Sequence, residues 1–326
     1  METIKTPFFW LFSIIWSVIN CLNRGLIKIG ITKPIRLESQ VISVGNIQAG
    51  GSGKTPLIAL IAEQAHQRGL SVCILTRGYH SAWEKHGGII HPGSDEMDPS
   101  VCGDEPALLH KLCPFATIGV GKNRVKQYRA VQAEKKIDLV LLDDGFQNRK
   151  IIKDLDIVAW TSAKPGQRLF REFESSLKRA DLVVWTKGCR PPPALTSQPV
   201  VKISYDLSGA PNYSPDSFKA PLPLWLITGV ADPRSVRELL VKSGYSVTKH
   251  TVYRDHFRYS SSLIKQTLNK ASQENLRVAL TGKDWVKWKS QGFDLVKSPD
   301  VDVMVFEPKI RFEKGMEIWN RVLWNE

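Results

Sequence analysis

Residues 41–56 read VISVGNIQAGGSGKTP, a short β-branched run that continues through four glycines and ends where a helical pattern begins. Glycines let the backbone N–H groups of such a loop converge on an anion, and the helix N-terminus adds the positive end of its dipole. The pattern therefore predicts a phosphate-binding loop. We expect Lys54 to reach the β- and γ-phosphates of ATP and the Thr55 hydroxyl to ligate Mg²⁺. The nucleotide-binding residues predicted in this way are Gly50, Gly51, Ser52, Gly53, Lys54, Thr55 and Pro56.

The loop departs at one position from the strict G-x-x-x-x-G-K-[ST] pattern, because Gln48 stands in place of the first glycine. Gly50 and Gly51 supply the same backbone freedom closer to the lysine, and Gly45 opens the turn from the strand. The alternative is a glycine-rich turn without a chemical role. That alternative leaves Lys54 unexplained, since a cation is disfavoured at a helix N-terminus.

A second stretch, residues 137–147, reads IDLVLLDDGFQ and predicts the metal-binding half of the same site. Its apolar run delivers Asp143 and Asp144 to the carboxyl edge of the sheet, where α/β proteins bind their ligands. Carboxylates at this position hold Mg²⁺ in P-loop proteins. Taken alone, a strand that ends in two aspartates is more often a surface turn. It indicates a metal site here because the phosphate loop precedes it.

Short β-branched runs alternate with helical stretches throughout the chain after Pro34, as is typical of a parallel sheet with crossover helices. We therefore predict an α/β fold with a P-loop NTPase-like parallel sheet, a second, smaller α/β domain and an N-terminal membrane-interface helix. The predicted strands are Val41–Val44, Ser71–Thr76, Ala116–Val120, Asp138–Leu142, Asp156–Trp160, Asp181–Trp185, Leu224–Thr228, Ser246–Thr251, Arg277–Thr281 and Val301–Phe306. The predicted helices begin near Lys54, Asp104, Lys122, Arg168, Asp232, Ser260 and Lys283, and Glu313–Trp324 forms a last amphipathic helix.

Two stretches rich in Pro, Gly and Ser, Arg190–Pro193 and Ser208–Pro223, predict a hinge or domain boundary. The predicted division is an N-terminal membrane-associated helix at 1–33, a P-loop domain at 34–205, a second α/β domain at 206–313, and a C-terminal helix at 314–326 that returns to the first domain.

The composition describes a basic globular protein of 326 residues with a formal charge of +13 and a pI near 9.5. Such a charge favours anionic partners, which are nucleic acid, an acidic membrane face or phosphorylated ligands. The basic residues are scattered and no zinc-finger or RNA-binding pattern accompanies them, so nucleic acid ranks third. The five cysteines are odd in number and include no C-x-x-C pair, which fits a reduced compartment.

The N-terminal region is strongly apolar, and residues 8–22 read FFWLFSIIWSVINCL. This run is shorter than the roughly 20 apolar residues that a spanning helix needs. We interpret residues 5–30 as a helix in the membrane interface, with Trp10 and Trp16 in lipid and the basic end near headgroup phosphates. The alternative is a core helix that packs on its own domain.

Phosphoryl transfer from ATP to a hydroxyl needs a proton acceptor and cations that neutralise the moving charge. Asp104 is a candidate for the acceptor, although it stands where a helix N-cap is also expected. His256 follows a predicted strand and is, on pattern alone, a structural histidine. Arg77 closes a strand of the first sheet and Arg124 opens a helix. Both are candidates for phosphate or substrate contacts, or ordinary surface arginines.

These motifs together resemble those of the tetraacyldisaccharide 4'-kinases of Gram-negative bacteria. The resemblance runs nearly end to end and rests on the apolar N-terminus, Gly45-Asn46, Gly50 to Pro56, Arg77-Gly78-Tyr79, Gly103-Asp104-Glu105-Pro106, Asp143 to Gln147 and Asp255-His256. It implies an ATP- and Mg²⁺-dependent kinase that phosphorylates the 4' hydroxyl of a disaccharide 1-phosphate, a lipid A precursor. It also implies a place on the cytoplasmic face of the inner membrane and a glycolipid substrate, without nucleic acid or an obligate protein partner.

The resemblance implies a role for each candidate residue. Asp104 is the base that faces the sugar hydroxyl, and His256 comes over from the second domain to tune it. Lys54 serves the phosphates, and the metal ligands are Thr55, Asp143 and Asp144. The expected substrate or phosphate contacts are Asn46, Arg77, Arg124 and Gln147.

The chain departs from the family pattern at a few positions. Asn148 stands where the family has histidine, and Gly282 stands where it has glutamate. The turn at 228–231 has fewer glycines than expected. These departures concern the surroundings of the site, whereas the phosphate loop, the Asp pair and the Asp104/His256 pair are all present.

Two other classes of protein are compatible with parts of this sequence. A membrane-associated P-loop NTPase that acts as a switch or assembly factor has no organic acceptor and does not need Asp104. A nucleic-acid binder driven by net charge predicts a steep dependence of polynucleotide affinity on salt.

Overall fold

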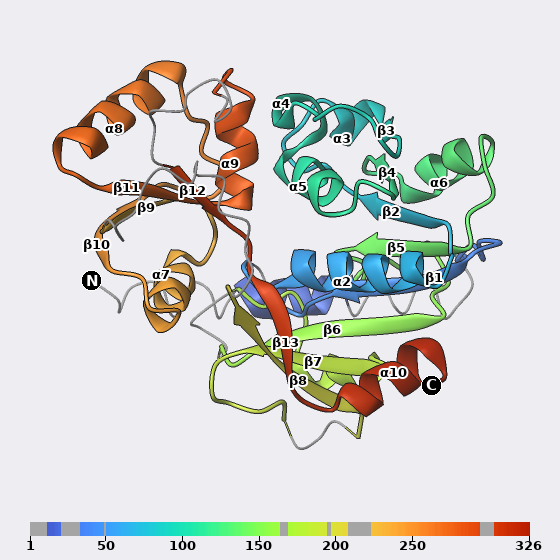
Figure 1. Ribbon diagram of the computed structural model, residues 1–326. Coiled ribbons are helices and arrows are strands. Elements are labelled where there is room, and N and C mark those ends of the chain that lie inside the picture. Colours follow the sequence, from blue (N-terminus) through green and yellow to red (C-terminus); the bar gives the residue numbers. More distant parts are fainter. Residues whose placement is uncertain are drawn as a thin grey trace.

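The computed structural model describes residues 12–20, 33–48, 50–163, 169–193, 197–207, 223–293 and 303–326. These residues form two sheets flanked by helices. Figure 1 shows the smaller sheet beside the upper part of the larger one. The strands of the larger sheet are β1 (Gln40–Gly45), β2 (Val72–Thr76), β3 (Gly88–Ile90), β4 (Thr117–Val120), β5 (Leu139–Asp143), β6 (Leu155–Thr161), β7 (Leu182–Lys187), β8 (Val200–Asp206) and β13 (Lys309–Lys314).

The larger sheet has the order β13-β8-β7-β6-β1-β5-β2-β4-β3 and is parallel except for its two edge strands, β3 and β13. The central strands are buried on both faces, which explains their continuous apolar sequences. β1 lies between β5 and β6, so the chain changes from one side of β1 to the other there. Ligands of open α/β sheets bind at such a switch point, beyond the carboxyl ends of the strands.

The smaller sheet is entirely parallel, with the order β10-β9-β11-β12. Its strands are β9 (Leu224–Thr228), β10 (Val247–Val252), β11 (Arg277–Thr281) and β12 (Val303–Phe306), and its helices are α7 (Pro233–Lys242), α8 (Ser261–Gln273) and α9 (Gly282–Lys289). The chain then leaves β12 and returns through β13 to the larger sheet.

Helices cover the larger sheet and close its core. They are α2 (Lys54–Gln67), α3 (Trp83–His86), α4 (Pro99–Cys102), α5 (Asp104–Leu112), α6 (Arg124–Gln132), the 3₁₀ helix η1 (Glu174–Arg179) and α10 (Met316–Trp324). Helix α2 buries Leu57, Ile58, Ile61, Ala62 and Ala65, which recur at helical spacing on one side. Helix α5 contacts α9 and so joins the two sheets.

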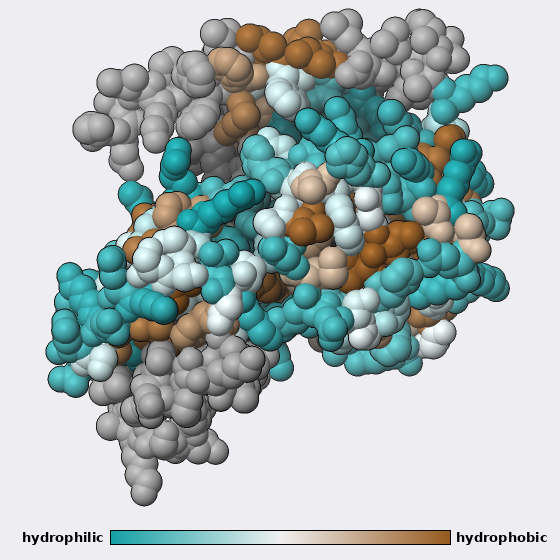
Figure 2. Space-filling model, turned by 90° about the horizontal axis from the view of Figure 1, so that it is seen from above, coloured by the Kyte–Doolittle hydropathy of each residue, from teal (hydrophilic) through white to brown (hydrophobic). Residues whose placement is uncertain are grey.

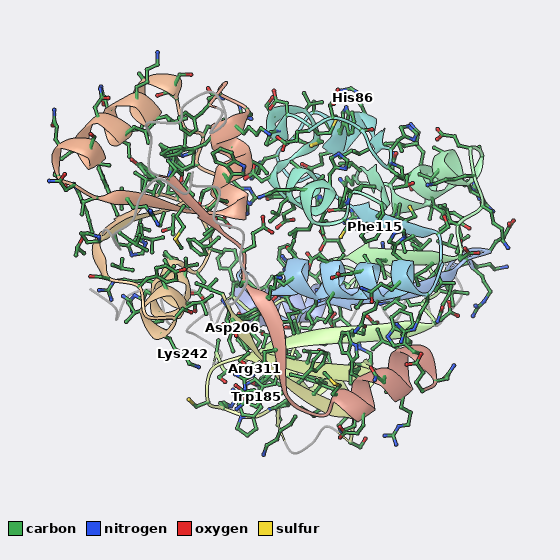
Figure 3. All side chains as sticks on the ribbon, viewed as in Figure 1. His86, Phe115, Trp185, Asp206, Lys242 and Arg311 are labelled. Carbon is green, nitrogen blue, oxygen red and sulfur yellow. The ribbon has the colours of Figure 1, made fainter. Side chains whose placement is uncertain are left out.

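The C-terminal helix α10 packs against α2. Both Trp319 and Trp324 donate their indole N–H groups to Gln64 Oε1, at 2.9 and 3.1 Å. The Arg68 guanidinium also pairs with Glu326 at 2.8 Å. Figure 3 shows Trp185 of β7 and Arg311 of β13 on this side of the molecule, near the edge of the sheet that β13 forms.

The predicted α/β fold with a large parallel sheet is confirmed, whereas the membrane-interface role of the N-terminal helix stays a prediction. Every predicted strand is found, and over the described residues its ends are shifted by at most two positions. Three strands were not predicted: β3, β8 and β13. The last helix was predicted too long, because Lys309–Lys314 pairs with β8 as an edge strand and the helix begins only at Met316. The start of the helix predicted near Arg168, and nearly all of the predicted hinge at 208–223, lie outside the described residues. The domain boundaries remain predictions.

Residues 12–20 form a helix whose polar side faces the protein. Ser13 and Ser17 are buried, and Ser13 Oγ accepts the backbone N–H of Phe170 at 2.8 Å. Asn20 Nδ2 donates to the backbone O of Arg171 at 2.9 Å. A helix that packs by its polar side leaves its apolar side open to the surroundings.

The open side of this helix carries Phe12, Ile15, Trp16 and Ile19, with Val18 beside them, and each is between 43% and 50% exposed. Their spacing of i, i+3, i+4 and i+7 defines one face. Figure 2 shows apolar side chains gathered between grey, undescribed atoms at one edge of an otherwise mostly hydrophilic face. No helix in the described part of the chain is long and apolar enough to cross a bilayer. Trp10 lies outside the described residues.

Candidate active site

The phosphate loop begins where β1 ends, directly beside the end of β5. The register pairs Val44 with Asp143, so the loop and the Asp-Asp turn leave the sheet at the same edge. A side chain at Gly45 would place its Cβ 2.5 Å from Phe146 Cβ, so only glycine allows this approach. At the other end of the loop, Gly53 has a φ of 80° and precedes the first residue of α2. The predicted loop therefore stands at the central strand of the sheet, with Lys54 at the start of a helix.

Polar side chains stabilise the loop through hydrogen bonds to its own residues and to β6. Asn46 Nδ2 donates to Ser52 Oγ at 2.8 Å, and Gln147 Nε2 donates to the backbone O of Asn46 at 2.9 Å. Gln48, which replaces the first glycine of the pattern, is fully buried and donates to Thr161 Oγ1 on β6. Asn46 and Gln147 were expected to contact substrate or phosphate, and in this structure their amide groups support the loop itself.

Asp144 lies between two cations. Lys54 Nζ is 3.3 Å from its Oδ1, and Arg171 Nη1 is 2.5 Å from its Oδ2. Burial alone would raise the pKa of Asp144, but Lys54 and Arg171 hold it well below its usual range. The backbone of Asp144 has a φ of 52°, a left-handed conformation that non-glycine residues seldom adopt and that occurs often at functional sites.

Arg171 is a site residue that the sequence did not reveal. It follows no strand and belongs to no motif, and it reaches the site because its backbone N–H donates to Ile47 O of the phosphate loop at 2.7 Å. The same short segment is hydrogen-bonded to the helix at 12–20, because Arg171 O accepts from Asn20 Nδ2 and the Phe170 N–H donates to Ser13 Oγ. Only a tertiary contact of this kind brings Arg171 to Asp144.

Asp143 is buried, and other carboxylates lie near its side chain. Thr76 Oγ1 donates to its Oδ2 at 2.8 Å. Burial, together with the carboxylates of Glu105 and Asp144, outweighs Lys54 and raises the pKa of Asp143 to about 7. A divalent cation is the group that would neutralise such a cluster.

The donor set at this position fits Mg²⁺. No three His, Cys, Asp or Glu side chains converge within the described ranges in the way that an all-protein metal cage requires. Mg²⁺ in P-loop sites instead takes a hydroxyl and one or two carboxylates, and completes its shell with phosphate oxygens and water. Thr55, Asp143 and Asp144 supply this kind of set.

The raised pKa of Asp143 predicts a pH-dependent effect on stability. Between about pH 4 and pH 7 the unfolded chain has lost the Asp143 proton and the folded protein retains it, so the wild type loses stability as pH rises. Asp143→Asn removes this loss. Without nucleotide we expect the variant to exceed the wild type in Tm by about 3 °C or more at pH 8, and to match it near pH 4.5. The exposed Asp95→Asn serves as control in the same thermal scans, and an equal difference at both pH values would contradict the prediction.

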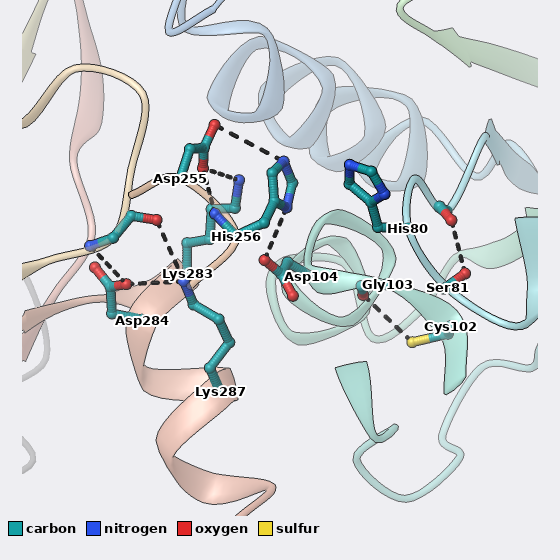
Figure 4. Close-up of polar contacts among 12 residues, drawn as sticks. His80, Ser81, Cys102, Gly103, Asp104, Asp255, His256, Lys283, Asp284 and Lys287 are labelled. Atoms are coloured by element: carbon teal, nitrogen blue, oxygen red, sulfur yellow. Dashed lines mark hydrogen bonds and ion pairs between the residues drawn. The ribbon is translucent and has the colours of Figure 1, made fainter. Parts of the chain in front are cut away.

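Asp104 and His256 meet across the two sheets. Asp104 is the first residue of α5, after Gly103, so the alternative of an N-cap aspartate is wrong. His256 follows β10, and its Nδ1 lies 3.1 Å from Asp104 Oδ2, as Figure 4 shows. Burial would raise the pKa of Asp104, but the His256 hydrogen bond and the charges of Lys287 and Lys283 lower it. The result is an ionised carboxylate, which is the state that accepts a proton.

A cavity of about 120 Å³ opens beside this pair. Its walls come from helices and loops next to both sheets: Tyr79, His80, Pro99, Ser100, Asp104, His256, Arg258, Tyr259, Lys287, Ser290 and Gln291. The Asp104 carboxylate therefore faces a polar space that a hydroxyl-bearing ligand can enter.

The two predicted arginines have different surroundings: Arg124 contacts the Asp-Asp turn, and Arg77 contacts Glu84. Arg124 is half-buried, with its guanidinium 3.5 Å from the backbone O of Asp143. Burial lowers the pKa of Arg124, while Asp143 and Asp144 counteract this effect. Arg77 is more exposed and pairs with Glu84 at 2.7 Å.

Glu105 connects the two halves of the site. It follows Asp104 on α5, and its charge acts on Asp143 at the end of β5. The start of α5 thus lies between the Asp104/His256 pair and the carboxylates next to the phosphate loop. A phosphate loop with a lysine and a paired carboxylate, and an ionised Asp–His pair nearby, define the class of P-loop phosphotransferases.

The chain belongs to the tetraacyldisaccharide-1-P 4'-kinase (LpxK) family, whose model matches residues 5–323. The tetraacyldisaccharide 4'-kinase of Pelobacter propionicus is 31% identical over 293 residues, which are 85% of this chain and 81% of that protein. The protein of the same name from Haemophilus influenzae is 26% identical over 95% of this chain and 92% of its own length. The structure of the "apo" form of LpxK from Aquifex aeolicus in complex with ATP is similar over 96% of both chains, with a TM-score of 0.76 and 26% identity. These similarities favour the kinase over the P-loop switch.

Proposed function

We propose that this protein transfers the γ-phosphate of ATP to the 4' hydroxyl of a tetraacyl disaccharide 1-phosphate, the precursor of lipid A. The observation that carries the proposal is the contact between Asp104 and His256 beside a polar cavity, with Glu105 linking that pair to the phosphate loop. A nucleotide switch needs the loop but has no use for an ionised base that faces an open cavity.

In this proposal each group has a separate task. The loop amides at 50–55 bind the triphosphate, and Lys54 neutralises charge on the transferred group. Mg²⁺, when held by Thr55, Asp143 and Asp144, would supply charge neutralisation at the β- and γ-phosphate oxygens. Asp104 accepts the proton of the 4' hydroxyl as the new O–P bond forms and the bond from the γ-phosphorus to the β-phosphate oxygen breaks, so that ADP leaves. His256 orients the carboxylate.

The basic residues around the cavity suit an anionic acceptor. Arg77 is 45% exposed and lies 5.4 Å from the ring of Tyr79, which lines the cavity, so it can turn toward an incoming phosphate. Arg124 is fixed beside Asp143 and suits a phosphate that is already bound at the loop. The formal charge of +13 favours both kinds of contact over a neutral acceptor.

The helix at 12–20 supports a place on the membrane surface, on the cytoplasmic face of the inner membrane. Its polar side is hydrogen-bonded to Phe170 and Arg171, and its apolar side is open. A core helix packs in the opposite sense. An apolar face of this kind lies in the lipid interface, where the acyl chains of a glycolipid also lie.

A single substitution tests the membrane contact. Ile19→Asp places a charge on the open side of the helix, and we expect it to lower the fraction that floats with anionic vesicles by roughly fivefold or more. Val241→Asp is the matched control, because Val241 is 49% exposed on α7 and Ile19 is 50% exposed. Equal flotation of the two variants would reject the membrane role of the helix.

The reaction itself is tested with labelled ATP, Mg²⁺ and the monophosphorylated disaccharide lipid in detergent or mixed micelles. The expected product carries a second phosphate on the 4' oxygen, identified by mass spectrometry and selective hydrolysis. ATP hydrolysis without any phosphorylated lipid would overturn the proposal and return the switch as the better explanation.

A further inference from the structure

A second carboxylate, that of Asp255, lies on the side of the His256 imidazole away from Asp104. Asp255 Oδ1 accepts the backbone N–H of His256 at 3.1 Å, and Asp255 Oδ2 lies 3.8 Å from His256 Nε2. Lys283 Nζ donates to Asp255 Oδ1 at 3.0 Å. Figure 4 shows the resulting line of four side chains, from Lys283 through Asp255 and His256 to Asp104.

His256 needs such support because its backbone is in an unfavourable conformation. Its φ is 62°, in the left-handed region that non-glycine residues enter only when their surroundings hold them there. The hydrogen bond from the His256 N–H to Asp255 fixes the turn locally. The turn is otherwise a surface loop, with Asp255 33% exposed at its side chain.

Lys283 stands at a position that disfavours a cation. It lies in the first turn of α9, where the positive end of the helix dipole repels an ammonium group. Burial would lower the pKa of Lys283, but the carboxylates of Glu105, Asp255 and Asp104 raise it. The charged form of Lys283 is therefore stabilised by the carboxylates of the site, whereas the dipole of its own helix disfavours it.

The first two turns of α9 are held by contacts with the rest of the second sheet, so the backbone at Lys283 has a defined position. Asp284 is fully buried and accepts hydrogen bonds from the backbone N–H of Gly229 and from Tyr259 OH, both at 3.0 Å. Lys287 Nζ pairs with the same carboxylate at 3.0 Å. These contacts tie α9 to the end of β9 and to the segment that follows His256.

We propose that Lys283 and Asp255 are positioning residues for the transfer reaction: Lys283 fixes the Asp255 carboxylate, which fixes the His256 turn so that the imidazole meets Asp104. The proposal rests on the function proposed above, in which Asp104 is the base. Neither residue touches the reacting atoms. Loss of the anchor lets the turn relax, and a shift of about 1 Å in a catalytic group costs up to about 100-fold in rate.

The test compares two lysines of the same helix. Lys283→Met is expected to lower kcat by about 10- to 100-fold and to leave the KM for ATP within about twofold, because the phosphate loop is untouched. Lys283→Arg retains the charge and is expected to recover most of the rate. Lys289→Met is the matched control, since Lys289 also lies on α9 and pairs at 2.6 Å with Glu96, which is on the loop before α4 and away from His256.

A double-mutant cycle separates positioning from a general loss of structure. Asp255→Ala is expected to lower kcat at least as much as Lys283→Met, because it also removes the acceptor of the His256 backbone N–H. Adding Lys283→Met to Asp255→Ala is expected to lower kcat no further, because the contact between the two residues is already lost. Full kcat in Lys283→Met would overturn the proposal. So would losses that multiply in the double variant, or an equal loss in Lys289→Met.

A readout without substrate distinguishes this proposal from the function on which it rests. In the imidazole ¹H–¹⁵N spectrum of the free protein, the Nδ1 resonance of His256 is expected to shift and broaden in Lys283→Met and to be unchanged in Lys289→Met. If the spectrum changes while Asp104→Asn retains full activity, the positioning is correct and the assignment of the base is wrong. An unchanged spectrum in Lys283→Met sinks the positioning role whatever the enzyme transfers.

Discussion

Replacing Lys54 by methionine is expected to lower kcat for phosphate transfer by about 100- to 1,000-fold, the usual effect of removing a group that stabilises transition-state charge. Lys54 is 18% exposed at the start of α2 and has no role in the core. Methionine has a similar length, and Asp144 keeps its contact with Arg171 in the variant. The loss should therefore come from the missing ammonium group rather than from unfolding. Steady-state rates and ATP titration calorimetry measure the two parts of the effect.

Lys136→Met is the control for this substitution. Lys136 is 90% exposed and has only a distant pairing with Asp138. The rate of phosphate transfer by Lys136→Met should therefore equal that of the wild type. If Lys54→Met bound ATP with wild-type affinity and transferred phosphate at the wild-type rate, the loop would not be the phosphate site.

Replacing Asp104 by asparagine is expected to lower kcat by about 100- to 10,000-fold, the range for the loss of a general base. Asparagine keeps the size and can still contact His256, but its amide cannot accept the hydroxyl proton. The KM for ATP should stay within about twofold, because Asp104 lies on the acceptor side of the site. Lipid phosphorylation at saturating ATP is the measurement.

The control is Asp95→Asn, an exposed aspartate on the loop between β3 and α4. It should retain the full rate and the same thermal stability. A wild-type rate in Asp104→Asn would remove this residue as the base and leave the Asp104–His256 contact as an interaction that joins the two sheets.

The two substitutions act on different halves of one site. Lys54→Met should weaken ATP binding and slow transfer to any acceptor, whereas Asp104→Asn should slow transfer to the lipid alone. Glu105, which follows the base on α5 and acts on Asp143, lies between these halves. Movement of α5 would therefore change both the metal carboxylates and the base together.

Much of the site could be predicted because its residues stand in local motifs. The strand, glycines and Lys54-Thr55 predict a phosphate loop by themselves, and a run such as LVLL must be a buried strand that delivers Asp143 to a sheet edge. The α/β fold follows from the same alternation of short strands and helices. The strands β8 and β13 were not predicted, because β13 is an exposed edge strand and β8, which lies next to it, is only partly buried, so neither has a continuous apolar sequence.

Other parts of the site have no local signal. Arg171 reaches Asp144 only because a backbone hydrogen bond ties its segment to Ile47. His256 meets Asp104 only because α5 and α9 bring two sheets together. Lone arginines and histidines of this kind are mostly structural, so their pattern could not separate them from the rest.

The sequence by itself determined that this chain folds around a parallel sheet and binds a polyphosphate at the end of its first strand. Glycine spacing and buried β-branched runs act over a few neighbouring residues, so they can be recognised in the sequence alone. Only the tertiary structure decided which charges meet, because Asp104 and His256 are 152 positions apart and their contact depends on the packing of helices from both sheets. Only the fold, too, turned Ser13 and Ser17 inward and left the apolar side of the first helix open, since burial depends on what each face can contact.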